Sequence, residues 1–279
     1  MPQYERVVII GVGLLGGSIG LALRKRGLAN RVIGIGRNLL SLEQARKLGA
    51  ITDVSQSLQS ACENADLVVV CTPVQQISLW VNTCSELPLS SNCLITDVGS
   101  TKSNIVGSVD QSAHSRFCGS HPIAGSERSG VQFASAELLE GRMTIVTPTS
   151  ATPAQVAVRI EEFWHSIGSQ TQQMTAAEHD QAIANISHLP HLIASALACA
   201  TESELLPLVG TGWQDTTRIA AGGVEMWQQI VAENSKPILQ ALNGFTLHLQ
   251  EWIEVIESGN SKQLVKLLEC GKSKRDSVS

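Results

Sequence analysis

One histidine of this sequence lies where an imidazole can act on a bound molecule. His121 follows a predicted strand and lies in a stretch rich in glycine, serine and proline, Gly119–Gly125, which is typical of a loop. Ser100 also follows a predicted strand, so both side chains can lie at one edge of a sheet. Because an imidazole is the usual group for proton transfer near neutral pH, His121 is a candidate general base, although a lone histidine is more often structural.

Two further histidine segments occur in the second half of the chain, His179-Asp180 and Ser187–His191. His188 and His191 are three residues apart and can share one face of a helix. A metal site would need a third ligand, usually with a carboxylate at fixed spacing, and the sequence has no H-E-x-x-H motif or cysteine cluster. We therefore predict that no metal is bound.

The last polar segment, Asp215-Thr-Thr-Arg218, lies between glycine-rich turns. The planar guanidinium of Arg218 suits a bidentate clamp on a carboxylate. The alternative is an ordinary surface pair between Asp215 and Arg218.

The element that must position these side chains begins near the N-terminus. An unbroken β-branched run, Val7–Ile10, predicts a central parallel strand buried on both faces. The glycines after it match G-x-G-x-x-G and precede an apolar helical pattern that Gly27 can end. This context predicts a dinucleotide site, with the pyrophosphate at the turn and the helix N-terminus. The residues expected to contact the cofactor are Gly11, Gly13, Leu14, Leu15 and Gly16.

The second predicted strand, Arg31–Gly36, ends in residues that indicate which cofactor is bound. NAD-specific folds usually place Asp or Glu at this point to bind the ribose 2′-hydroxyl. Here Gly36 brings no carboxylate to repel a 2′-phosphate, and Arg37 can pair with that phosphate. The alternative for Arg37 is a solvated surface charge. We predict NADP, with Arg37 and Asn38 among its contacts.

Strands and helices alternate through the first part of the chain. Further strands are predicted over 65–73, 93–98 and 143–147, and helices over 41–48, 75–85 and 153–165. This alternation predicts the α/β class, with a doubly wound, Rossmann-type parallel sheet. Because such sheets bind ligands at the carboxyl ends of their strands, Thr72 and Pro73 are also expected to contact the cofactor.

Beyond about Gln172 the sequence predicts only helices, over 176–186, 188–202, 224–234, 236–257 and 261–272. Their apolar residues recur at helical spacing and should pack against the first domain or against a second copy of the chain. We predict two domains, a dinucleotide-binding domain over 1–172 and an all-α domain over 173–279.

The composition of the 279 residues is ordinary for a soluble protein, with 43% hydrophobic and 16% charged residues. A formal charge of −5 and the lack of a long basic run argue against nucleic acid as a partner. We expect no membrane association, since no signal-like start and no apolar run of spanning length are evident. The seven cysteines form no C-x-x-C pair, which favours reduced thiols and a cytoplasmic location.

Taken together, these segments resemble the prephenate/arogenate dehydrogenase family of tyrosine biosynthesis. The matching motifs span nearly the whole chain in the family's order: G-x-G-L-x-G-G-S near the N-terminus, Asp97–Lys102, Gly119–Gly125, His179-Asp180, Ser187–His191 and Asp215–Arg218. Each motif is weak alone, but the ordered set is specific. The resemblance implies a homodimer, formed through the helical domain, with cofactor and substrate meeting between the domains.

The resemblance also implies the reaction, an oxidative decarboxylation of a cyclohexadiene ring that becomes aromatic. His121 would accept a hydrogen bond and then the proton of the 4-hydroxyl, and Ser100 would hold His121 and the nicotinamide in place. Arg218 would bind a substrate carboxylate. His188 is our choice for the histidine that lines the substrate pocket, with His191 as the alternative. Two acidic residues would act less directly. Glu127 and Asp215 are expected to form an ionic gate with arginines at the mouth of the cleft.

Substrate choice lies between arogenate and prephenate, which differ in their side chain. Compact relatives that use NADP often prefer arogenate, so arogenate is the expected substrate.

Two other functions remain open. Another NADP-linked enzyme, such as a β-hydroxyacid dehydrogenase or an imine reductase, would usually rely on a lysine, serine or threonine. A protein that only senses NADPH and catalyses no reaction would have no need for both His121 and Arg218.

Overall fold

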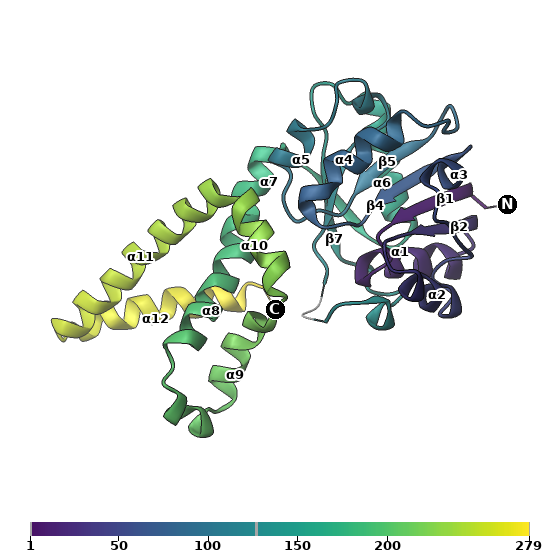
Figure 1. Ribbon diagram of the computed structural model, residues 1–279. Coiled ribbons are helices and arrows are strands. Elements are labelled where there is room, and N and C mark those ends of the chain that lie inside the picture. Colours follow the sequence, from purple (N-terminus) through teal and green to yellow (C-terminus); the bar gives the residue numbers. More distant parts are fainter. Residues whose placement is uncertain (1, 126–127, 279) are drawn as a thin grey trace.

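The computed structural model of the protein describes residues 2–125 and 128–278. Its first half is built on a five-stranded parallel sheet with the strand order β3-β2-β1-β4-β5 (Figure 1). The strands are β1 (Tyr4–Ile10), β2 (Ala29–Ile35), β3 (Asp53–Val54), β4 (Leu67–Val70) and β5 (Leu94–Asp97). The order reverses direction at β1, and the carboxyl ends of β1 and β4 lie side by side there. This is the place where open α/β sheets bind their ligands.

Helices cover both faces of this sheet, which confirms the predicted fold class. They are α1 (Leu14–Lys25), α2 (Leu39–Lys47), α3 (Leu58–Cys62), α4 (Val74–Ser85), α5 (Ser103–Gly107) and α6 (Ala154–Ser166). Alternate residues of β1 enter two separate cores, since Val7 and Ile9 pack with α1, α2 and α6, whereas Val8 and Ile10 pack with α3, α4 and α5. The β-branched run at β1 is therefore buried on both sides, as its sequence predicted.

A second, three-stranded sheet carries the predicted strand 143–147, which does not join the main sheet. This sheet consists of β6 (Gly119–Pro122), β7 (Met143–Thr147) and β8 (Gln170–Gln173), with β6 antiparallel to β7. A bridge between Ile95 and Phe117 connects the chain just before β6 to β5. Two short 3₁₀ turns, η1 (Ala113–Ser115) and η2 (Val131–Phe133), complete this half. The second sheet places β6, and with it His121, beside the carboxyl end of β5.

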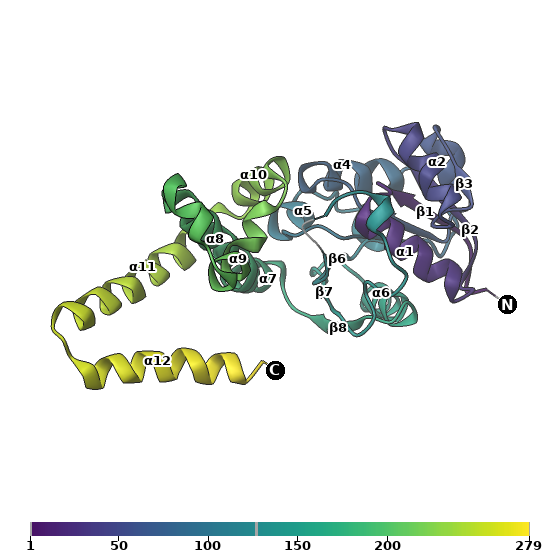
Figure 2. The ribbon, with the colours of Figure 1, turned by 90° about the horizontal axis from the view of Figure 1, so that it is seen from below.

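From Ala176 onward the described chain is helical. The elements are α7 (Ala176–Ile183), a π-helical turn η3 (Ala184–His188), α8 (Leu189–Ala200), 3₁₀ turns η4 (Ser203–Leu208) and η5 (Arg218–Ala221) with α9 (Thr211–Thr217) between them, α10 (Val224–Glu233), α11 (Ser235–Glu257) and α12 (Ser261–Asp276). In Figure 2, α11 and α12 extend away from the rest of the molecule as a helical hairpin.

The expected helix break near Ser187 is instead a π-helical turn within a continuous helix, from α7 through η3 to α8. Pro190 explains the departure, because a proline inside a helix lacks the N–H that would bond to the carbonyl four residues back. A π-turn absorbs the irregularity without ending the helix, and such turns frequently occur at functional sites. It brings His188, at its end, into the buried interior of this half.

The helix Ala176–Ala200 is long and apolar enough to cross a membrane by length and composition alone, with a mean hydropathy of 1.3 over its most apolar window. Only 28% of that window is buried inside the structure, and the expectation of no membrane association stays a prediction. The finding is weak evidence for a membrane, since the core helices of soluble proteins pass the same test.

Candidate active site

The glycine-rich turn between β1 and α1 has the shape of a phosphate cradle. Gly11 has φ +94°, and a Cβ there would lie 2.5 Å from the carbonyl oxygen of Cys71. A Cβ at Gly16 would lie 2.2 Å from the carbonyl oxygen of Gly11, so only glycine allows this turn and this helix packing. By contrast, no described atom lies within 4 Å of a Cβ at Gly13, which leaves the backbone there open to a ligand.

The start of α1 adds donors to this cradle. Its first residues are Leu14 and Leu15, and among the described residues no side chain caps the helix. Their N–H groups are therefore available to an anion. Across the turn, the buried hydroxyl of Thr72 has no hydrogen-bond partner within the described chain, and Pro73 after it is the N-cap residue of α4. An unpaired buried hydroxyl at this edge fits a site that a polar cofactor completes.

The residues predicted to select the cofactor lie directly after β2. Gly36 and Arg37 are both exposed after Ile35. A Cβ at Gly36 would meet only the side chain of Leu42, at 3.5 Å or more, so packing does not demand glycine there. The side chain of Asn38 accepts the N–H of Ser41 at 3.2 Å and thereby caps α2. Asn38 therefore has a structural task besides the predicted one.

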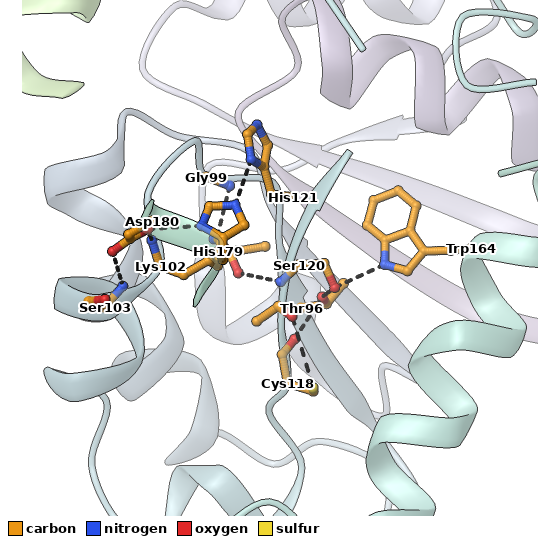
Figure 3. Close-up of polar contacts among 12 residues, drawn as sticks. Thr96, Gly99, Lys102, Ser103, Cys118, Ser120, His121, Trp164, His179 and Asp180 are labelled. Carbon is orange, nitrogen blue, oxygen red and sulfur yellow. Dashed lines mark hydrogen bonds and ion pairs between the residues drawn. The ribbon is translucent and has the colours of Figure 1, made fainter. Parts of the chain in front are cut away.

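His121 is joined to the helical half by a chain of side-chain contacts (Figure 3). Its Nδ1 lies 2.9 Å from Nε2 of His179, the fourth residue of α7. Nδ1 of His179 in turn lies 2.8 Å from the carboxylate of Asp180. That carboxylate accepts the backbone N–H groups of Lys102 at 2.7 Å and Ser103 at 2.8 Å. Two imidazoles and a carboxylate thus connect β6, α7 and the start of α5.

A buried ion pair lies next to these hydrogen-bonded side chains. The ammonium of Lys102 contacts the carboxylate of Asp97, and both side chains are fully buried. Asp97 also accepts the N–H of Gly99 at 2.8 Å and the N–H of Ser120 at 3.0 Å. The hydroxyl of Ser120 is held by Trp164, whose ring N–H donates to it at 3.0 Å. The strand residue before His121 is therefore fixed from two sides.

The surroundings set the charge of these groups. Burial lowers the pKa of His121 well below its ordinary value, and the adjacent His179 and Lys102 lower it further. Burial also lowers the pKa of His179, against the opposing effect of Asp180. Although burial alone would raise the pKa of Asp180, hydrogen bonds from His179 and Ser103 hold it below its usual range. At neutral pH both imidazoles are therefore neutral beside a charged carboxylate.

The helical half contributes a second group of rings. The imidazole of His191 stacks on Trp227 with 3.5 Å between ring centroids, and His188 meets the same indole edge-on at 5.9 Å. Asn234 links His188 to α7, because its Nδ2 lies 3.1 Å from His188 Nδ1 and donates to the backbone carbonyl of Asp180 at 2.9 Å. Within residues 2–125 and 128–278, His188 Nε2 and His191 Nδ1 are buried without a hydrogen-bond partner.

The other predicted site residues lie as follows. Arg218 is exposed at the start of η5, a turn that packs against α8, and Asp215 is exposed on α9. Ser100 is half-buried in the loop after β5, and in the described part of the chain it has no hydrogen bond to His121 or to any other residue. Glu127 lies outside the described residues. Among the described residues no group of three or more metal-ligating side chains occurs.

Several residues that build this site carry no predicted role from the sequence, among them His179, Asp180 and Asp97, which lie in quoted motifs. Lys102 also lies in one of these motifs, and a lysine five residues after the aspartate of a buried strand is itself a signal for an ion pair. Trp164 and Trp227 carried no signal of their own, because apolar aromatic residues on helices usually indicate core packing. Asn234 lies at a predicted helix end, and its contacts across the fold leave no trace in the local sequence.

The comparisons with known proteins agree with this geometry. Residues 19–173 match the family model "Prephenate dehydrogenase, nucleotide-binding domain", and residues 175–270 match "Prephenate dehydrogenase, dimerization domain". The chain is 33% identical to prephenate dehydrogenase from Bacillus subtilis, over 98% of this chain and 76% of that protein.

Two solved structures are similar over their whole length. Prephenate dehydrogenase from A. aeolicus, in complex with hydroxyphenyl propionate and NAD+, has a TM-score of 0.91 and 32% identity, covering 99% of this chain and 98% of that chain. Synechocystis arogenate dehydrogenase has a TM-score of 0.83 and 29% identity, covering 99% of this chain and all of that chain. The protein therefore belongs to the prephenate/arogenate dehydrogenase family, whose members are oxidoreductases of tyrosine biosynthesis.

Proposed function

We propose that the protein catalyses the NADP-dependent oxidative decarboxylation of arogenate to tyrosine. The observation that carries this proposal is the position of His121, a neutral imidazole next to the carboxyl end of β5 and hydrogen-bonded to His179 of the helical half. The open backbone at Gly13 and the uncapped start of α1 support a dinucleotide at the same edge. The nicotinamide, when bound, would supply the hydride acceptor.

The residues of the chain then have defined tasks. His121 accepts the proton of the substrate's 4-hydroxyl while hydride leaves the same ring carbon, C4. The bond to the ring carboxylate breaks, CO2 departs, and the electron pair enters the ring, which becomes aromatic. His121 can return its proton to the phenolate oxygen. Ser100, beside the buried Asp97 loop, would orient the nicotinamide, and a buried nitrogen of His188 or His191 would contact the substrate.

Arg218 is proposed to bind the ring carboxylate, with Asp215 and Glu127 at the mouth of the cleft. Replacing Arg218 by glutamine should raise the substrate KM about 10- to 100-fold, because hydrogen bonds between charged groups contribute roughly 1.5–3 kcal/mol. Cofactor affinity should stay unchanged. Arg218→Lys keeps the charge but loses the planar fork, so its substrate KM should lie between those of the wild type and Arg218→Gln. Steady-state kinetics measure the KM of each variant for substrate and for cofactor. An unchanged substrate KM in Arg218→Gln would exclude Arg218 as the carboxylate-binding residue.

The preference for NADP is supported by the end of β2. Gly36 has room for a larger side chain, so the lack of an acidic residue there is not a packing requirement. Arg37 is exposed beside it, where a guanidinium can pair with a 2′-phosphate. The relative from A. aeolicus holds NAD+ in its structure, so cofactor choice is a property to test for this chain.

Replacing Arg37 by alanine should narrow the preference for NADP over NAD by about 10-fold or more, since a charge-assisted contact to the 2′-phosphate is lost. Arg46→Ala is the matched control, because Arg46 is an exposed arginine on α2 that pairs with Glu43. Ratios of kcat/KM for the two cofactors provide the measurement. If both variants keep the wild-type ratio, Arg37 is only a surface charge.

Prephenate is the second candidate substrate, favoured by the 33% identity to the B. subtilis prephenate dehydrogenase, whereas the Synechocystis structure supports arogenate. An absorbance assay at the NADPH band, with each substrate paired with NADP and with NAD, decides between them. We expect the fastest reduction with arogenate and NADP. Faster turnover of prephenate would reassign the substrate, and no turnover in any of the four pairs would overturn the proposal.

We also propose a homodimer formed through the helical half. None of the α12 residues is buried, and α11 buries only three of its residues although both helices carry large apolar side chains. The exposed ones are Leu239, Leu247, Leu249, Ile253, Ile256, Val265 and Leu268. Soluble monomers rarely expose so much apolar surface in one region. The family model that matches 175–270 is that of a dimerization domain.

Sedimentation equilibrium at micromolar concentration should give twice the mass of the chain. The double variant Leu247→Glu/Ile253→Glu changes exposed positions of α11 and places charges in the proposed interface. Its measured mass should shift toward that of the monomer. Leu40→Glu, on the exposed face of α2, is the control and should leave the dimer intact. A wild-type protein that sediments as a monomer would contradict the proposal.

A further inference from the structure

We propose that His179 and Asp180 are positioning residues that fix which ring nitrogen of His121 accepts the substrate proton. The inference rests on the proposed function and deepens it. His121 belongs to the nucleotide-binding half, whereas His179 and Asp180 belong to α7 of the helical half (Figure 3). The partners of the Asp180 carboxylate leave no choice of hydrogen position.

The carboxylate of Asp180 can only accept hydrogen bonds. Its Oδ1 accepts the backbone N–H of Lys102 at 2.7 Å, and its Oδ2 accepts that of Ser103 at 2.8 Å. Backbone N–H groups cannot accept in return, so both oxygens act as acceptors. Oδ1 also lies 2.8 Å from Nδ1 of His179. That nitrogen must therefore carry a hydrogen.

The hydrogen on His179 then determines the state of His121. A neutral imidazole with hydrogen on Nδ1 has a lone pair on Nε2, and Nε2 of His179 lies 2.9 Å from Nδ1 of His121. Nδ1 of His121 must donate to it. In a neutral His121 this leaves the lone pair on Nε2, the nitrogen free to receive the 4-hydroxyl proton. Without the two residues of α7, either nitrogen of His121 could carry the hydrogen.

Further contacts hold α7 in the orientation that this requires. A capping box fixes the first turn of α7, since Thr175 accepts the N–H of Glu178 at 3.2 Å and the Glu178 carboxylate accepts the N–H of Thr175 at 2.8 Å. Asn234, between α10 and α11, donates to the backbone carbonyl of Asp180 at 2.9 Å. His179 is fully buried and Asp180 nearly so. Both side chains are thus held from several elements.

The hydrogen positions can be measured without turnover. In the wild-type protein labelled with 15N-histidine, we expect His121 to carry its hydrogen on Nδ1 and to have a bare Nε2 at neutral pH. The spectrum of His121→Asn identifies the His121 signals. A hydrogen on Nε2, or an even mixture of the two forms, would overturn the proposal whatever the activity. Because this readout needs no substrate, it stays decisive if the proposed reaction fails.

Three variants test the consequence for catalysis. His179→Leu should lower kcat about 10²- to 10³-fold and leave both KM values within about twofold, since the reacting base loses its fixed orientation. His179→Gln should recover at least about tenfold of that loss, because its amide oxygen can accept from Nδ1 of His121. His165→Gln, at an exposed histidine of α6, is the control. Equal kcat in the Leu and Gln variants, or wild-type kcat in His179→Leu, would contradict a positioning role.

Discussion

Replacing His121 by asparagine should lower kcat at least about 10²-fold and change the substrate KM little. The imidazole acts on the 4-hydroxyl as the ring is oxidised, and a general base of this kind contributes about 10²- to 10⁴-fold to the rate. An effect on kcat without an effect on KM indicates an interaction made in the transition state. The absorbance of NADPH, followed at saturating substrate, measures the loss.

The pH profile provides a second readout of the same residue. His121 must be neutral to accept a proton, and its pKa is lowered well below 6.5 by burial and by its neighbours. Activity should therefore stay high as the pH falls through 6.5 and decline only at lower pH, where His121 becomes protonated. His165→Asn serves as the control for loss of an imidazole, because His165 is exposed on α6. A His121→Asn enzyme with the wild-type rate would remove His121 as the base.

Replacing Lys102 by methionine should lower the free energy of unfolding by about 3–5 kcal/mol. Both partners of the Lys102–Asp97 ion pair are fully buried, so the substitution leaves a buried carboxylate without its counter-charge. The backbone N–H groups of Gly99 and Ser120 still bind the carboxylate but cannot neutralise it. Urea denaturation, followed by circular dichroism, measures the change.

Two controls make this result specific. The double variant Lys102→Met/Asp97→Asn should be less destabilised than Lys102→Met alone, because the unpaired charge is removed together with its partner. Lys25→Met, at an exposed ion pair with Glu137, should leave the stability nearly unchanged. If Lys102→Met is as stable as Lys25→Met, the buried pair does not support the site in the way that its geometry indicates.

The sequence predicted the parts of the fold that depend on local patterns. The β-branched run at β1, the glycine turn and the helix after it are local features, and the structure confirms them. The alternation of strands and helices, followed by helices alone, was enough to predict the fold class. These signals work because burial on both faces of a strand and the geometry of a tight glycine turn leave a direct trace in residue type.

Other parts depend on contacts that no local pattern encodes. The strand β8, Gln170–Gln173, is polar and mostly exposed, so it carries no hydrophobic period and was missed. The π-turn at Ala184–His188 follows from a proline whose effect depends on the surrounding helix. Likewise, the sequence placed His121 and His179 in separate candidate motifs, but the hydrogen bond between them exists only because β6 and α7 pack together.

In the proposed mechanism, His121 faces the oxygen of a substrate ring bound between the two halves of the chain. A crystal structure with NADP+ and hydroxyphenyl propionate, the ligand seen in the A. aeolicus relative, tests it most directly. We predict that the phenol oxygen lies within hydrogen-bond distance of His121 Nε2 and that Arg218 contacts the bound molecule. A ligand bound away from His121, or an imidazole whose Nε2 points away from the ring, would contradict the account.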